Sequence, residues 1–228
     1  MQRIRKSFFA LAVTAGLLVG ASMAVTPAKA ASLPFNFTGD IFTSQSPLTP
    51  TILTSHSVVG TFTFNDSTGA VEAFSMNFLN LSSVVVYTTT QGVGANEVTI
   101  INNGPLGGGA FGDRWQLETK ATSLTPISTF SPLSFDIQLD GDTGGVSSLL
   151  TSSALQSPPS ISGNPDLTSN RWRLIFDDGG LTTRVVLGSL TSLTAVPLPP
   201  AVILFGAGLI ALIGLGARNR QRAENSVA

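Results

Sequence analysis

The feature that most constrains the fold is a strict alternation of apolar and polar residues in short segments. In SVVGTFTFN, Val58, Phe62 and Phe64 fall on one face of an extended chain, while threonines fall on the other. Successive side chains of a β-strand point to opposite faces, so this two-residue period predicts a strand with one buried face. The period recurs along residues 31–195, and no segment there shows a convincing helical period. We therefore expect an all-β domain.

Turn residues separate the expected strands. NDSTG at 65–69 follows the first strand and precedes a second apolar–polar segment at 74–78, which predicts a hairpin. Further strands are expected at 84–90, 97–101, 115–118, 133–140, 171–176 and 182–190. Residues 151–170 are polar and irregular, and we expect a long loop there. Many short strands separated by Gly, Pro and Asn turns are typical of an antiparallel β-sandwich, which is the predicted fold of residues 31–195.

The first thirty residues have the pattern of an export signal. Three basic residues precede an apolar run at 8–20, and Ala28 and Ala30 occupy the small-residue positions that signal peptidase requires. Cleavage after Ala30 would leave a mature chain that begins at Ala31, exported through the Sec translocon. The alternative is a retained membrane anchor, which the short apolar run and the cleavage site disfavour.

The other end of the chain contains a candidate membrane helix. Residues 201–217 include no charged or strongly polar side chain, and as a helix they would span about 25 Å of a hydrocarbon core of about 30 Å. Residues 196–200, also apolar, supply the remaining length. Arg218, Arg220 and Arg222 follow, and positive flanks stay on the cytoplasmic side. A buried core helix is the alternative, which the apolar character all round the helix disfavours.

A proline motif precedes this apolar segment. It reads Val196, Pro197, Leu198, Pro199 and Pro200. Proline donates no backbone hydrogen bond and disfavours helix at the preceding residue, so the motif should stay extended just outside the helix. A protease binds an extended backbone, which makes the motif a candidate processing site; the alternative is a simple linker.

The proline motif, the glycine-containing apolar segment and the arginines together resemble the PEP-CTERM sorting signal, over residues 196–222. Leu198 stands where the commonest motif of that family has Glu, as in the VPLP-type tails. The resemblance implies recognition in the inner membrane of a Gram-negative bacterium by exosortase, an integral-membrane cysteine protease. It also implies an association with exopolysaccharide and biofilm, and an ectodomain that lies in the periplasm before it reaches the surface.

Composition excludes several classes of function. Residues 31–195 carry five basic and twelve acidic residues, a net charge of −7. An acidic domain without a basic stripe is not expected to bind nucleic acid. The chain has no cysteine, which rules out thiol nucleophiles, thiolate metal sites and disulfides.

Few residues point to chemistry. His56 is the only histidine, and we expect it to be a solvated polar residue. Asp140, Asp142 and Gly144 match the start of a Ca²⁺ loop, but the later ligand positions are missing, so a hairpin turn is favoured. DDGG at 177–180 is likewise expected to form a turn.

The tryptophans and glutamates leave two further functions open. Trp115 and Trp172 could be platforms for sugar rings, but their alternation favours the core. Glu118 is the only glutamate of the domain beside an aromatic-bearing strand, whereas glycoside hydrolysis needs two carboxylates.

These observations predict four parts: a signal peptide at 1–30, a β-sandwich ectodomain at 31–195, a sorting signal at 196–222 and a cytoplasmic end at 223–228. We expect an exported, non-enzymatic surface or matrix protein that needs no metal or cofactor. The alternatives are a carbohydrate-binding module and a secreted hydrolase.

Overall fold

A computed structural model describes residues 32–49, 51–107, 110–141 and 148–196. These ranges form nine strands and no helix that is long and apolar enough to cross a membrane. The strands are β1 (Ser32–Ser44), β2 (Ser57–Asn65), β3 (Val71–Leu79), β4 (Val85–Gln91), β5 (Glu97–Gly107), β6 (Ala110–Thr122), β7 (Ser131–Gly141), β8 (Leu167–Asp177) and β9 (Thr183–Ala195). The predicted all-β, antiparallel character is confirmed.

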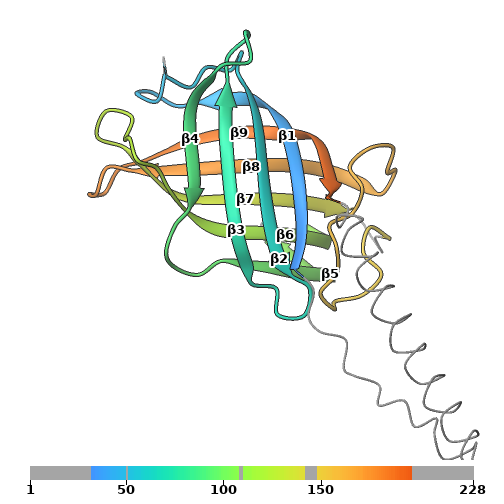
Figure 1. Cartoon of the computed structure of the whole chain (residues 1–228). Coiled ribbons are helices and arrows are strands. Elements are labelled where there is room, and N and C mark those ends of the chain that lie inside the picture. Colours follow the sequence, from blue (N-terminus) through green and yellow to red (C-terminus); the bar gives the residue numbers. More distant parts are fainter. Residues whose placement is uncertain (1–31, 50, 108–109, 142–147, 197–228) are drawn as a thin grey trace, which may run out of the picture. The chain divides into compact units, whose positions relative to one another are not determined.

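The strands belong to one sheet that closes on itself. Their order is β4-β3-β2-β1-β9-β8-β7-β6-β5, and β4 also pairs with β6. Eight strands therefore make a closed barrel, and β5 extends from β6 outside the ring. The closure is brief, since only Thr90 and Gln91 of β4 pair with Thr122 and Ala121 of β6. Figure 1 shows β1 to β4 lying across β6 to β9, so the barrel has two walls whose strands cross.

The predicted sandwich is thus replaced by a single closed sheet. One strand that was not predicted, β1, contributes to the difference. No strand was predicted at 32–44, yet β1 pairs with β2 on one side and β9 on the other. In β1 the buried residues Phe35, Phe37, Gly39 and Ile41 alternate with less buried ones, and the register with β9 shifts at Gly39. β1 joins the two walls on one side of the barrel, and the β4–β6 pairing joins them on the other.

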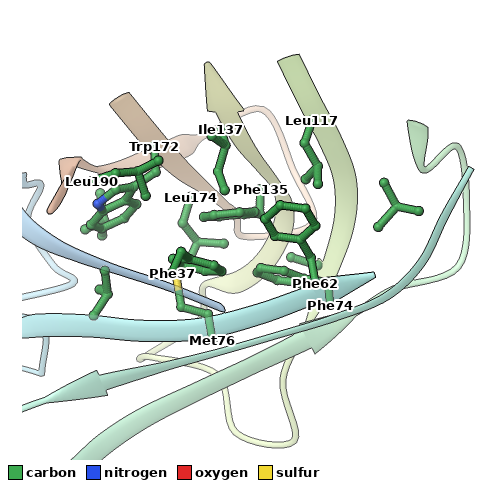
Figure 2. Packing of buried hydrophobic residues seen from close by; sticks show 14 of the residues in the cluster. Phe37, Phe62, Phe74, Met76, Leu117, Phe135, Ile137, Trp172, Leu174 and Leu190 are labelled. Atoms are coloured by element: carbon green, nitrogen blue, oxygen red, sulfur yellow. The ribbon is translucent and has the colours of Figure 1, made fainter. Parts of the chain in front are cut away.

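Aromatic rings from both walls fill the barrel interior (Figure 2). Phe37 of β1 stacks on Phe135 of β7 with ring centroids 5.7 Å apart. Phe74 of β3 also stacks on Phe135, with ring centroids 4.4 Å apart. An eight-stranded barrel has an interior just wide enough for side chains to fill. The inward faces predicted for β2, β3, β6 and β8 are confirmed, because their large apolar residues are buried.

Glycines create the space that the largest ring occupies. A Cβ atom on Gly39 of β1 would lie 2.8 Å from Nε1 of Trp172, and one on Gly188 of β9 would overlap the Trp172 ring and the carbonyl oxygen of Asp40. Trp172 itself is fully buried. These glycines let β1 and β9 approach each other beside an indole ring, so they help to close the barrel.

Two loops cover the ends of the barrel. Between β1 and β2, Leu48 and Ile52 are fully buried. Between β7 and β8, Leu149 and Leu150 are buried, and Leu155 is partly buried against the core. The interior is therefore closed by side chains at both ends as well as along its walls.

Candidate functional site

Most residues of the predicted sorting and cleavage sites lie outside the described residues. This holds for Ala28, Ala30 and Ala31, for residues 197–200, and for Arg218, Arg220 and Arg222. Val196 is described: it follows β9, and its N–H donates to the carbonyl oxygen of Pro34, at 2.9 Å. Phe35 pairs with Ala195, so the first and last strands of the barrel begin and end at the same end of the molecule.

Asp140 lies in a strand and not in an ion-binding loop. Its two carboxylate oxygens accept hydrogen bonds from Arg114 Nε and Nη2, at 2.7 and 3.1 Å, and Gln138 donates to it at 2.5 Å. Asp142 and Gly144 lie outside the described residues. In the described part of the chain, no group of three His, Asp or Glu side chains is placed to hold a metal ion.

The expectation for His56 is wrong. This histidine is buried at the end of the loop before β2, with 7% of its surface exposed. Its Nδ1 accepts the N–H of Leu53 at 3.2 Å, and its own N–H donates to the Leu53 carbonyl at 3.1 Å. His56 therefore closes a turn. The polar sequence around it gave no sign that Leu48 and Ile52 would draw this loop over the barrel end.

Both tryptophans belong to the core, as predicted. Trp115 and Trp172 are fully buried, so neither ring can stack on a sugar. Trp115 Nε1 donates to the carbonyl oxygen of Gln156, at 3.0 Å, which ties the β7–β8 loop to β6. Glu118 is exposed on the outer face of β6.

The outer face of β7 carries a ladder of polar side chains covered by its neighbours. Asp136, Gln138 and Asp140 point away from the core yet are buried. Arg173 Nε donates to Asp136 Oδ2 at 2.6 Å, and Arg171 donates to the Gln138 side chain. Arginine stems shield these groups from water. The ladder joins β6, β7 and β8 through their side chains as well as their backbones, which indicates a structural role.

Asp136 is the strained member of this ladder. Its Oδ1 is buried and has no hydrogen-bond partner among the described residues, and Glu118 lies opposite on β6. Burial raises the pKa of Asp136, and the contact with Arg173 offsets part of that rise. A carboxyl group with a raised pKa can serve acid–base chemistry. Here the acid is 2% exposed, so a substrate cannot reach it.

The DDGG segment forms the predicted turn between β8 and β9. Asp178 Oδ1 accepts the N–H of Gly180 at 2.9 Å, and Gly179 has a φ of 78°. The backbone hydrogen bond from Gly180 lowers the pKa of Asp178. Glycine suits this turn because a positive φ costs it little.

A hollow of the described surface lies at the closing seam of the barrel. This seam groove has a volume of about 520 Å³ and is lined by residues 85–88 and Thr90 of β4 and by residues 122–125. Its side chains are neutral: hydroxyls from threonines and Ser123, with Val85 and Leu124 at the margin. Tyr87 forms part of the wall, and burial raises the pKa of its phenol.

Models of protein families, curated proteins and solved structures all gave no significant match.

Sequence reasoning missed the seam groove, although one signal was available. Residues 73–96 and 121–135 contain no Asp, Glu, Lys, Arg or His, and these two runs supply its walls. The groove contains no carboxylate, imidazole or amine, so its described residues offer no acid, base or nucleophile stronger than a hydroxyl.

Proposed function

We propose that this chain is an exported, non-enzymatic surface or matrix protein whose C-terminal segment is an exosortase sorting signal. The observation that carries the proposal is the order of features at the chain end. The motif at 196–200, the apolar segment at 201–217 and three arginines follow directly on the last strand of the barrel. The same proposal includes two earlier steps. Signal peptidase cleaves the exported chain after Ala30, and the C-terminal segment then holds it temporarily in the inner membrane.

The position of the barrel within the sequence supports this. The first strand begins at Ser32, one residue after the expected mature N-terminus, and the last ends at Ala195, one residue before the proline motif. In the sequence, the expected processing sites therefore adjoin the first and last strands of the barrel. A protease needs an extended backbone that is free of sheet pairing; Val196, at the end of the described residues, still donates its N–H to the Pro34 carbonyl oxygen of β1.

The filled interior supports a structural role over either alternative. Glycoside hydrolysis would need two accessible carboxylates at one site; Asp136 is buried and Asp140 is paired with Arg114. A carbohydrate-binding module commonly stacks sugars on exposed aromatic rings, and both tryptophans lie in the core.

The test is a fractionation blot in a host with and without exosortase, with an epitope inserted in the ectodomain. Replacing Pro197 and Pro199 with Ala would allow helix to extend outward over the motif. We expect a longer, membrane-bound form to accumulate in the host that has exosortase. In the host without the protease, parent and variant should both remain uncut.

A second variant separates retention from cleavage. Changing Arg218, Arg220 and Arg222 to Ser removes charges whose transfer to the bilayer centre costs about 2.5–3.5 kcal/mol each. Uncut protein should then leave the inner membrane. If the double-proline variant is processed like the parent, the motif is a linker and the sorting proposal fails.

A further inference from the structure

The start of β1 is held in the sheet from its first residue. Ser32 pairs with Asn65 of β2, and Leu33 pairs with Phe64. The Ser32 hydroxyl also donates to Glu72 Oε2, at 2.6 Å, and Leu33 is partly buried against the core. Pulling Ser32 and Leu33 out of the sheet therefore breaks backbone pairing, a side-chain hydrogen bond and apolar contacts together.

The end of the last strand holds the same stretch of β1 from its other side. Phe35 pairs with Ala195 of β9, and the N–H of Val196 donates to the Pro34 carbonyl oxygen, at 2.9 Å. Because β9 is the last strand of the domain in the sequence, this second pairing can form only after the whole domain has been exported.

The bond that signal peptidase is expected to cut lies close to this paired stretch. It joins Ala30 to Ala31, so that only Ala31 separates it from Ser32. An extended chain spans at most about 3.6 Å per residue, which places the bond within about 7 Å of the Ser32 Cα atom. A peptide that binds in extended form pairs with its receptor as an added strand. Ser32 and Leu33 cannot pair with a protease in this way while they pair with β2.

We propose that entry of β1 into the closed barrel protects the signal peptide from cleavage, so that signal peptidase must act before the barrel closes. The inference rests on the proposed cleavage after Ala30. The site stays accessible during export because β1 lies between β2 and β9 in the sheet, and pairings between distant parts of a chain form slowly. A chain that folds before it is cut keeps its signal peptide.

The test compares folded and unfolded precursor of the full chain. One sample is refolded in mild detergent, with circular dichroism and tryptophan fluorescence to show that it is folded, and the other is diluted from urea directly into purified signal peptidase. The fraction cut is followed on a denaturing gel, and N-terminal sequencing identifies the first residue of the product. We expect the folded precursor to be cut roughly tenfold or more slowly, because β1 must first open locally.

An insertion identifies the cause of this resistance. Six Gly and Ser residues between Ala31 and Ser32 leave the cleavage signal intact and add up to about 20 Å of reach. The folded form of this variant should be cut as fast as the unfolded chain. The same insertion between Ser162 and Gly163, which are exposed in the β7–β8 loop, should leave the folded precursor resistant.

The outcomes separate this inference from the export proposal. Equal rates for folded and unfolded parent, with cleavage after Ala30, would overturn the inference and leave the export proposal standing. Resistance that persists with the insertion before Ser32 would also overturn it, because the nearby barrel would not be the cause. If the unfolded precursor is not cut after Ala30 either, the export signal fails and this inference fails with it.

Discussion

Gly188 lies where β9 passes both the Trp172 ring and the backbone of β1. A methyl group there would overlap the Asp40 carbonyl and the indole, and neither can move without opening the β1–β9 pairing. Overpacking of this kind costs about 1–3 kcal/mol. We therefore predict that Gly188→Ala lowers the free energy of unfolding by that amount in urea denaturation followed by tryptophan fluorescence.

Gly180→Ala is the matched control for that measurement. At Gly180 the new methyl group would meet only the flexible Asp178 side chain, at 3.2 Å, so a change within about 0.5 kcal/mol is expected. Combining Gly188→Ala with Trp172→Phe should show positive coupling, because the smaller ring leaves room for the methyl group. Independent, additive effects would show that the indole ring is not what excludes a methyl group at position 188.

Asp136 contributes to the folding stability of the domain, and this contribution decreases as pH rises. Burial raises its pKa above the ordinary value of 3.8, so the folded state binds this proton more tightly than the unfolded state. The contribution is complete below pH 3.8 and is lost as pH rises through the raised pKa. We predict that the stability of Asp136→Asn, relative to the parent, improves as pH increases from 3.8 toward neutrality, in urea titrations at several pH values.

Asp178→Asn provides a control of opposite sign. Because the pKa of Asp178 is lowered, its contribution is present above pH 3.8 and is lost as pH falls through the lowered value. This variant should lose stability relative to the parent as pH rises through the range below 3.8, and it should run parallel to the parent above it. A curve for Asp136→Asn that is also parallel to the parent's would refute the role assigned to Asp136.

At the scale of the elements, Asp113 holds the β7–β8 loop over the barrel end. It is fully buried, its Oδ2 accepts the N–H of Leu150 at 2.8 Å, and its Oδ1 accepts the N–H of Asn103 at 2.7 Å. Each lost bond costs about 1–3 kcal/mol. We predict that Asp113→Ala increases hydrogen exchange within residues 148–166 and leaves exchange in β1 and β9 unchanged.

The control variant for this exchange measurement is Glu97→Ala. It removes an exposed carboxylate from the neighbouring strand β5. It should leave exchange in 148–166 as it is in the parent. Faster exchange spread evenly over all strands in Asp113→Ala would mean that Asp113 supports the whole barrel rather than the loop.

Strands whose apolar residues alternate strictly could be predicted from the sequence. Trp172, Leu174 and Phe176 of β8 are buried as expected. The exceptions are elements whose burial depends on distant partners. β1 combines Phe35 and Phe37 with Pro34 and Gly39, and it becomes a strand because β2 and β9 supply neighbours on both sides. Its identity is therefore decided by tertiary pairing.

For the whole molecule, local alternation determines which residues face inward, but it does not determine whether the sheet closes into a barrel. Alternation is the same in a sandwich and in a small barrel, and the difference here rests on β1 and on a two-residue pairing between β4 and β6. The seam groove exists only because of that closure. Its walls, 85–90 and 122–125, are more than thirty positions apart in the sequence, so no local pattern could have joined them into one surface.

The neighbours of β9 have a mechanical consequence. β9 lies between β1 and β8, and the hydrogen bonds of an antiparallel ladder run perpendicular to the strands. A pull on Val196, directed along β9 and resisted from the far end of the barrel, would load both ladders in shear, so that many bonds share the force at once. A pull between Ser32 and Val196 would instead peel β1 from β9 one bond at a time. A force applied at the C-terminal end of β9 is therefore borne by a strand that is hydrogen-bonded on both sides.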